Sequence, residues 1–377
     1  MRYGCRTFGT EIKPMSKSKI ITRLLLCGTL LCAFPLLAQT PPPITAPGQP
    51  VAGPGGSTYP FAGVTANGPY WANNRTTNNN LQYYIYEPNT PTPTQAPVIL
   101  FLHGYGAILP ANYQAWINHM CKKGYIVVWV KYQATPTSAF SSYPANAQAA
   151  WTDALYRLQN FWWEHHVQPQ KSPTGLLETL IVGHSFGGWI AAWLAGAQPA
   201  STPHFPPPLG LVMIEPASLS LLPAINFAGI PATIKMLILT GDQDNVACSK
   251  DAVSIFESTT QVPDVQKNYL WFNSDSTGTP NQIGNHYFPN TGGFNDTAAI
   301  DTRDFYVTWK LSVGAANCLT RGTDCQYFLG GGTVDQLGMG SWSNGQPVNP
   351  MSYYADPTTL PPVGGCAAAA QRVRQRN

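Results

Sequence analysis

Charged residues are scarce in this chain. Asp, Glu, Lys and Arg together make up 10% of its 377 residues, and the formal net charge is +3. No basic stripe with interleaved aromatic residues occurs, so we expect no nucleic-acid partner. No internal repeat is apparent. Apolar residues, in contrast, reach 44%, which is enough for one large core or two small ones.

The N-terminus lacks an apolar run long enough for a comfortable membrane span. Lys13, Lys17, Lys19 and Arg23 precede the apolar stretch 24–38, LLLCGTLLCAFPLLA. A basic region followed by a short apolar region predicts a signal peptide over residues 1–38, with Met1 and Met15 both open as the start. A retained membrane anchor is the alternative. Export predicts a secreted or periplasmic protein with no membrane span after cleavage.

Composition divides the rest of the chain into three segments. Residues 39–58 are rich in Pro and Gly and are expected to form a linker. Residues 59–315 are expected to form the main folded domain. Beyond residue 315 the chain is rich in Gly and loses periodicity, so residues 316–377 are expected to be an irregular C-terminal extension.

Short β-rich runs alternate with helical patterns in the central segment. The run 81–87 alternates in polarity and predicts an early antiparallel strand, whereas later runs are apolar on both faces and predict strands covered on both sides. Because helical patterns separate these runs, we expect an α/β fold with a doubly wound, mostly parallel sheet. The short gap between residues 215 and 236 predicts no large cap domain. The apolar runs are 98–102, 126–130, 179–182, 211–215, 236–240 and 269–272; the helical patterns are 112–124, 146–163 and 186–198.

Five cysteines remain after removal of the signal, an odd number. Cys318 and Cys325 flank a short loop, and an exported protein favours disulfides, so we expect this pair to be bonded. The pairing of Cys121, Cys248 and Cys366 stays open.

The motif GHSFGG, residues 183–188, follows a predicted strand and opens a predicted helix. This context is typical of a nucleophile elbow, with Ser185 as the nucleophile. Gly183 and Gly187 have no Cβ, so the strand end and the helix can approach closely. The alternative is a glycine-rich turn with an incidental serine.

A serine nucleophile needs a histidine base and an orienting carboxylate, in the chain order Ser, Asp or Glu, His. The best carboxylates, Asp242 and Asp244, lie in the turn GDQD after the strand 236–240, and His286 is the one histidine beyond it. An oxyanion hole needs two backbone N–H donors. We expect them from Phe186 and, in the HGYG loop 103–106, from Tyr105.

These residues together resemble the α/β-hydrolase family, over about residues 60–313. The resemblance favours Asp244 over Asp242, because the family's acid commonly lies three residues after a glycine at a strand end. GHSFGG is similar to the lidless branch, which holds platelet-activating-factor acetylhydrolases, dienelactone-hydrolase-like proteins, cutinases and polyester hydrolases. Ser185 departs from the cysteine of dienelactone hydrolases proper, and His184 departs from the usual cutinase residue.

The sequence thus predicts a secreted serine hydrolase that cleaves carboxylic esters, with lipids and polyesters as candidate substrates. Tyr105, Trp189 and Trp271 are expected at the substrate site, with a position in the core as the more common alternative for each ring. We expect a monomer without cofactor or metal. Asp296, Asp301 and Asp304 leave open a structural Ca²⁺ site, but they fit solvated charges and helix-start residues better. The alternatives are a serine peptidase, an acyltransferase and a non-catalytic binding protein on the same scaffold.

Overall fold

The computed structural model describes residues 41–74, 77–135, 137–197, 207–293, 299–363 and 366. The predicted signal peptide lies outside these residues. Residues Pro43–Asn377 form one compact unit, and all further description concerns this unit.

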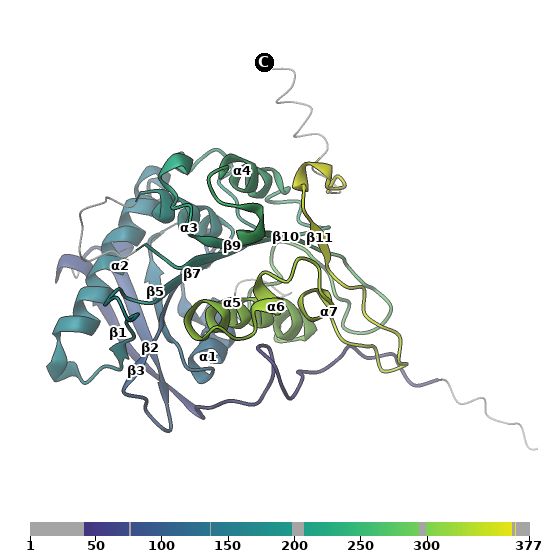
Figure 1. Cartoon of the computed structure of the whole chain (residues 1–377), viewed down its shortest axis with the longest axis horizontal. Helices are drawn as coiled ribbons and strands as arrows, with labels where there is room; N and C mark the ends of the chain where they lie inside the picture. Colours follow the sequence, from purple (N-terminus) through teal and green to yellow (C-terminus); the bar gives the residue numbers. More distant parts are fainter. Residues whose placement is uncertain are drawn as a thin grey trace, which may run out of the picture. The chain divides into compact units, whose positions relative to one another are not determined.

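A nine-stranded sheet forms the centre of the unit, in the order β1-β2-β5-β4-β7-β8-β9-β10-β11 (Figure 1). The strands from β5 to β10 in this order are parallel, whereas β1, β2 and β11 join antiparallel at the edges. This arrangement is the predicted α/β-hydrolase fold. The bounds are β1 Gly63–Trp71, β2 Gln82–Asn89, β4 Val98–Leu102, β5 Ile126–Lys131, β7 Thr179–His184, β8 Gly210–Ile214, β9 Lys235–Gly241, β10 Lys267–Phe272 and β11 Ser352–Tyr354; β3 Gln95–Ala96 and β6 Gln168–Pro169 pair separately.

Helices cover both faces of the sheet (Figure 1). Helices α2, α3 and α4 contribute to the core on one face, and α1 and α5 to the core on the other. The strand β4 shows why its sequence is apolar throughout: Leu100 and Leu102 enter the first core, while Ile99 and Phe101 enter the second. The helices are α1 Gln114–Lys122, α2 Tyr143–Asn160, α3 Phe186–Gly196, α4 Lys250–Ser258, α5 Trp309–Arg321, α6 Cys325–Phe328 and α7 Val334–Leu337.

None of the helices in the described part of the chain is both long and apolar enough to cross a membrane.

The structure differs from the expected segment boundaries at both ends of the domain. The expected linker is held against the domain: His119 Nε2 of α1 lies 2.8 Å from the Pro54 carbonyl, Lys123 Nζ donates to the Gly53 carbonyl, and the Ala46 amide donates to the Thr279 carbonyl. The expected boundary at residue 315 falls inside α5. The C-terminal extension is not wholly irregular either, because β11 adds a strand beside β10. Backbone hydrogen bonding at the sheet edge, rather than side-chain periodicity, orders this glycine-rich segment.

Two disulfides join parts of the compact unit. Cys318 is bonded to Cys325, across a sequence separation of 7. Cys248, which follows the GDQD turn, is bonded to Cys366 across a separation of 118. Cys121 is free and buried. The second bond ties the end of the described chain to the segment that carries Asp244.

We expect removal of the long-range disulfide to destabilise the protein more than removal of the short one. The loss of unfolding free energy for Cys248→Ser/Cys366→Ser should approach about 5 kcal/mol, against about 2.5 kcal/mol for Cys318→Ser/Cys325→Ser. The reason is that the entropy that a disulfide removes from the unfolded chain grows with the length of the loop that it closes. Chemical denaturation measures both losses. Equal losses would show that the longer bond does not constrain the unfolded chain as proposed.

Candidate active site

The turn between β7 and α3 places Ser185 in a strained conformation. Its φ of 55° and ψ of −123° are unusual for a residue with a side chain. The turn is tight enough to require glycine on both sides: a Cβ on Gly183 would lie 2.3 Å from the Gly187 carbonyl oxygen, and one on Gly187 would lie 2.2 Å from the Leu102 carbonyl oxygen. The strain therefore presents the Ser185 hydroxyl at the carboxyl end of the sheet, where α3 begins.

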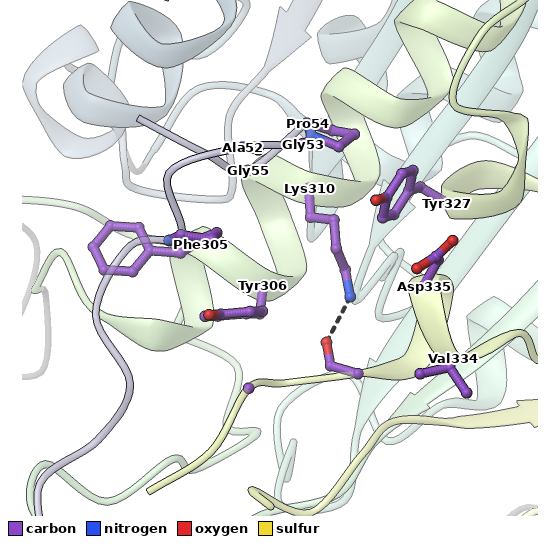
Figure 2. A pocket seen from close by; sticks show the side chains of 13 residues that line it. Ala52, Gly53, Pro54, Gly55, Phe305, Tyr306, Lys310, Tyr327, Val334 and Asp335 are labelled. Carbon is purple, nitrogen blue, oxygen red and sulfur yellow. Dashed lines mark hydrogen bonds between the residues drawn. The ribbon is translucent and has the colours of Figure 1, made fainter. Parts of the chain in front are cut away.

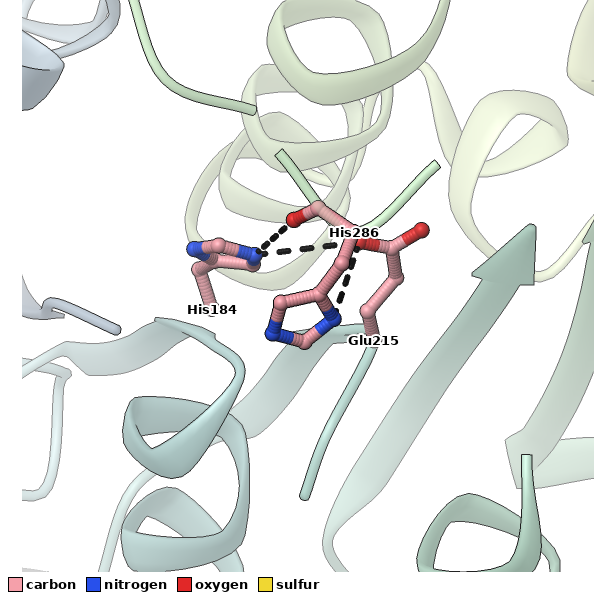
Figure 3. A group of neighbouring side chains, drawn as sticks. All are labelled: His184, Glu215 and His286. Carbon is pink, nitrogen blue, oxygen red and sulfur yellow. Dashed lines mark hydrogen bonds and ion pairs between the residues drawn. The ribbon is translucent and has the colours of Figure 1, made fainter. Parts of the chain in front are cut away.

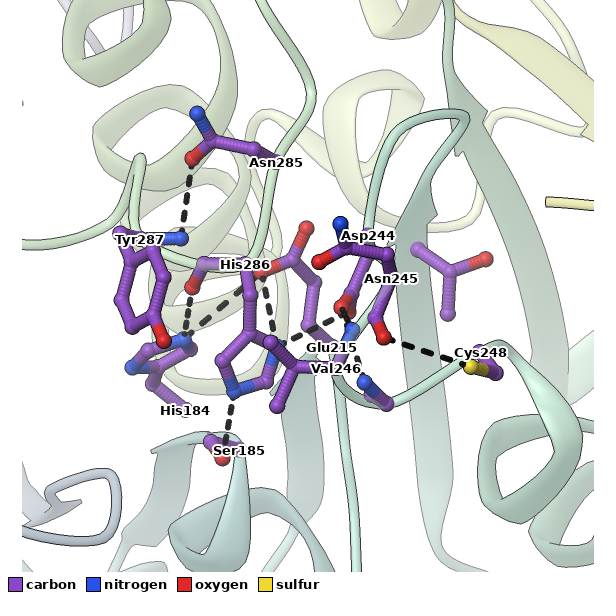
Figure 4. A network of polar contacts seen from close by, with 12 residues as sticks. His184, Ser185, Glu215, Asp244, Asn245, Val246, Cys248, Asn285, His286 and Tyr287 are labelled. Carbon is purple, nitrogen blue, oxygen red and sulfur yellow. Dashed lines mark hydrogen bonds and ion pairs between the residues drawn. The ribbon is translucent and has the colours of Figure 1, made fainter. Parts of the chain in front are cut away.

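Ser185, His286 and Asp244 form a line of hydrogen-bonding distances, although they come from three separate segments (Figure 4). His286 Nε2 lies 2.8 Å from Ser185 Oγ, and His286 Nδ1 lies 2.9 Å from Asp244 Oδ2. A carboxylate only accepts, so Nδ1 carries the proton and Nε2 offers its lone pair to the hydroxyl. All three side chains are buried. This arrangement can raise the nucleophilicity of a serine.

The two aspartates of the GDQD turn have different partners. Asp244 Oδ1 accepts hydrogen bonds from the amides of Val246 and Ala247, both at 2.9 Å, which leaves Oδ2 to face His286. Asp242 instead accepts from the Ser274 amide at 2.8 Å and from the Ser274 hydroxyl. The structure thus brings Asp244 to the histidine and uses Asp242 to hold the neighbouring loop.

The HGYG loop lies against the start of α3. The ring of Tyr105 is 5.4 Å from the ring of Phe186, centroid to centroid. The amide of Gly104 donates to the Tyr113 hydroxyl at 2.8 Å, and the amide of Gly106 donates to Gln133 Oε1 at 2.9 Å. Phe186 is the first residue of α3, and an amide at that position has no carbonyl partner within its own helix. The two expected oxyanion donors therefore belong to neighbouring backbone segments.

A chain of buried hydrogen bonds, missed in the sequence, links this loop to the histidine loop. The Tyr113 hydroxyl accepts from Gly104 and lies 2.8 Å from His184 Nδ1, while His184 Nε2 lies 2.9 Å from the carbonyl oxygen of His286. Since that carbonyl only accepts, His184 donates from Nε2 and accepts from Tyr113 at Nδ1. Burial holds the pKa of His184 well below its usual range, so the ring is neutral. His184 thus fixes the backbone of His286.

Glu215 is a second buried carboxyl beside the histidines (Figure 3). It directly follows β8, and its Oε2 lies 3.6 Å from His286 Nδ1 and 3.7 Å from His184 Nε2. Burial, and then the charge of Asp244, raise the pKa of Glu215 well above its usual range. The sequence carried one signal for it: an acidic residue at the carboxyl end of a buried parallel strand, where sites of α/β sheets gather.

His184, Glu215 and His286 are close enough together to raise the question of a metal site. Their hydrogen bonds do not fit one. His184 Nε2 carries the proton that it donates to the His286 carbonyl, and His286 Nδ1 carries the proton that it donates to Asp244. A metal ligand must offer a lone pair instead. We therefore assign no metal to these residues.

The expected substrate-site aromatics lie in different environments. Tyr105 is 39% exposed, but Trp189 is 8% and Trp271 only 3% exposed. Trp271 packs against Val363 and Cys366, and Trp189 donates from Nε1 to the Pro223 carbonyl. Both tryptophans therefore fit the core alternative, because the C-terminal extension covers the Trp271 ring and Trp189 lies in the core between the sheet and its helices.

Two exposed leucines near the nucleophile were not expected. The Ala217 amide donates to the Ser185 carbonyl, so the segment after β8 lies beside the elbow. Leu219 and Leu221 follow in this segment with exposed fractions of 47% and 48%. The segment that contacts the elbow through Ala217 thus carries two exposed apolar side chains.

The Ca²⁺ alternative also changes. Asp296 lies outside the described residues. Asp301 and Asp304 are buried rather than solvated. Asp301 pairs with Arg303, whose Nη2 lies 2.6 Å from Asp301 Oδ2, and Asp304 Oδ2 accepts from the Asp301 amide. Asp304 begins the π-helix Asp304–Thr308, which leads into α5, in agreement with a helix-start role.

A cavity of about 230 Å³ lies apart from the site around Ser185, and neither His286 nor Asp244 lines it (Figure 2). It lies between residues 50–55, the π-helix and the segment around α7. Lys310 lines it and donates from Nζ to the Gly338 carbonyl at 2.7 Å. Burial lowers the pKa of Lys310 to about 7.

Comparison with protein families gives a match over part of the chain. The family model described as Chlorophyllase matches residues 72–217. This family is α/β-hydrolase-like, in agreement with the fold, but the match does not single out the lidless branch. The matched segment contains Tyr105, Ser185 and Glu215 and ends before Asp244 and His286. No curated protein matches the chain.

Proposed function

We propose that this protein is an exported serine hydrolase that cleaves carboxylic esters through an acyl-enzyme intermediate. The observation that carries the proposal is the line of contacts from Ser185 Oγ through the His286 ring to Asp244, at 2.8 and 2.9 Å. It joins a strained serine at a helix start to a base and an orienting carboxylate, as nucleophilic catalysis requires.

The geometry supports the following sequence of steps. Ser185 Oγ attacks the ester carbonyl while His286 Nε2 takes its proton. Asp244 holds the Nδ1 proton and stabilises the imidazolium, and the amides of Tyr105 and Phe186 stabilise the oxyanion. His286 then returns the proton to the leaving alcohol. A water molecule, activated by the same histidine, releases the acid and restores Ser185.

Apolar acyl groups are the favoured substrates of this proposal. The two segments beside the elbow carry exposed apolar side chains, Tyr105 on one and Leu219 and Leu221 on the other. The segment between β8 and β9 supplies no large cap, which favours long or polymeric esters among the substrates that we propose. Lipids and polyesters are therefore the extended substrates to test beside small esters.

Export is supported by the two disulfides, since such bonds persist in oxidising compartments. The Chlorophyllase match favours ester hydrolysis over the peptidase and acyltransferase alternatives, because that family consists of ester hydrolases. The presence of all three side chains at hydrogen-bonding distance speaks against a non-catalytic scaffold. A monomer remains a prediction.

The test is hydrolysis of p-nitrophenyl esters from acetate to palmitate, with a p-nitroanilide of matching acyl chain as the peptidase control. A fluorophosphonate probe should also label the protein once, at Ser185, as located by mass spectrometry of the peptides. The rate profile over chain length then measures the acyl site. A folded protein that hydrolyses no ester and takes no label at Ser185 would contradict the proposal.

A further inference from the structure

Glu215 occupies a position that packing alone does not explain. It is fully buried at the end of β8, next to the strand end that carries Asp244. Neither of its carboxyl oxygens has a hydrogen-bond partner among the residues that the structure describes. A buried carboxyl without partners is costly, and an apolar residue would fill the space at less cost.

The backbone of Glu215 is strained as well. Its φ is 49°, in the left-handed region that residues with side chains rarely adopt. The Glu215 amide donates to the Leu239 carbonyl, which anchors this conformation to β9. Strain and an unsatisfied buried group at the same residue are typical of functional positions.

The Glu215 carboxyl is a second carboxyl beside the His286 ring, in addition to that of Asp244 (Figure 4). Its Oε2 is 3.6 Å from His286 Nδ1, the same atom that Asp244 Oδ2 approaches at 2.9 Å. Two carboxyls from adjacent strand ends thus face one imidazole nitrogen. The shorter distance gives the hydrogen bond to Asp244 and leaves Glu215 just beyond bonding range.

We propose that Glu215 is a second positioning carboxyl for His286. It accepts the hydrogen bond from Nδ1–H when the Asp244 carboxylate is absent. The inference rests on the proposed function, because it concerns the base of the same site. In the wild-type protein Asp244 is ionised and pairs with Nδ1, while Glu215 keeps its proton and adds no second negative charge.

The groups around Glu215 support this division of charge. Burial and the negative charge of Asp244 both raise the pKa of Glu215, and only the charge of Arg303 opposes them. His184, the nearest other ring, is neutral and adds no compensating positive charge. Removing the Asp244 charge removes one of the two causes, so the pKa of Glu215 falls while burial still holds it above its usual range.

The proton balance in Asp244→Asn is then as follows. Glu215 releases its proton to solvent as the pH rises through its own pKa, and the ionised carboxyl accepts the hydrogen bond from His286 Nδ1–H. During the reaction His286 Nε2 takes the Ser185 proton and returns it to the leaving alcohol. Between these two proton transfers, the ionised Glu215 carboxyl pairs with the imidazolium, and its own protonation state does not change.

The experiment compares the wild type, Asp244→Asn, Glu215→Gln and the double variant by kcat/KM for p-nitrophenyl butyrate between pH 5 and 9. An imidazole that loses its one orienting carboxylate loses about 10⁴-fold in rate. We expect Asp244→Asn to lose only about 10- to 100-fold at pH 9, and the double variant to lose about 10⁴-fold. The acid limb of Asp244→Asn should lie at higher pH than that of the wild type, and the double variant should lack this limb.

Asp242→Asn is the matched control, because Asp242 carries the same charge in the same turn but binds Ser274. Adding Glu215→Gln to Asp242→Asn should lower kcat/KM by no more than Glu215→Gln lowers it in the wild type. Glu215→Gln preserves the shape of the neutral acid, and thermal unfolding of each variant checks that it folds.

Two results would overturn the inference: an equal loss in Asp244→Asn and in the double variant at every pH, or an acid limb of Asp244→Asn that coincides with that of the wild type. Failure of the proposed function is distinguishable from either result, because the wild type would then hydrolyse no ester and take no label at Ser185.

Discussion

Ser185→Ala is expected to lower kcat for p-nitrophenyl butyrate by about 10⁶-fold. Removal of the nucleophile from a serine triad costs about this much, and the remaining donors still accelerate the reaction by roughly 10³–10⁴ over water. In this protein His286 and Asp244 have no reacting partner once Oγ is gone, because Nε2 faces Ser185 at 2.8 Å. KM should change far less than kcat, since the hydroxyl contributes little to binding of the substrate.

The control is Ser57→Ala, which removes the hydroxyl of an exposed serine far along the chain from the motif. It should keep wild-type rates and take the fluorophosphonate label, whereas Ser185→Ala should take none. A Ser185→Ala protein that is folded and retains more than about 1% of the activity would show that another group attacks the ester, since triad serines do not tolerate this change.

The sheet was predictable because burial on both faces leaves a mark in the sequence. Each central strand appears as a short apolar run, and the structure places alternate residues of β4 in opposite cores. The residues of the elbow were predictable for a related reason: glycine and serine at fixed spacing between a strand and a helix match few other structures. The edge strands β1 and β11 were missed. The pairing of β1 with β2 has an irregular register, and β11 follows a glycine-rich segment.

The supporting residues of the site were harder to predict. Tyr113 and His184 act through hydrogen bonds between segments that are 71 residues apart, and no local pattern encodes such a pair. The partner of Cys248 lies at a separation of 118, and spacing identified only the bond between neighbouring cysteines. The sequence left both a core position and a substrate-site position open for Trp271, and only the structure shows the ring packed against Val363 and Cys366.

Gly187→Ala is expected to destabilise the protein by more than about 3 kcal/mol, as overpacking at a site that cannot relax. Helix propensity alone predicts the reverse, a gain of up to about 1 kcal/mol, because Gly187 lies in α3. The steric term wins here, because the new Cβ would lie 2.2 Å from the Leu102 carbonyl oxygen and 2.7 Å from that of His103. Leu102 cannot move away, since β4 is paired with β5 on one side and β7 on the other.

The matched control is Gly48→Ala, where an added Cβ meets nothing within 4 Å, so its effect should stay within about 0.5 kcal/mol. Chemical denaturation gives both values. Any displacement in Gly187→Ala also moves His103 and the loop that carries Tyr105, so kcat should fall in whatever fraction stays folded. A Gly187→Ala protein with unchanged stability would mean that β4 and α3 can separate, and the close contact would then not be what keeps Ser185 in its strained conformation.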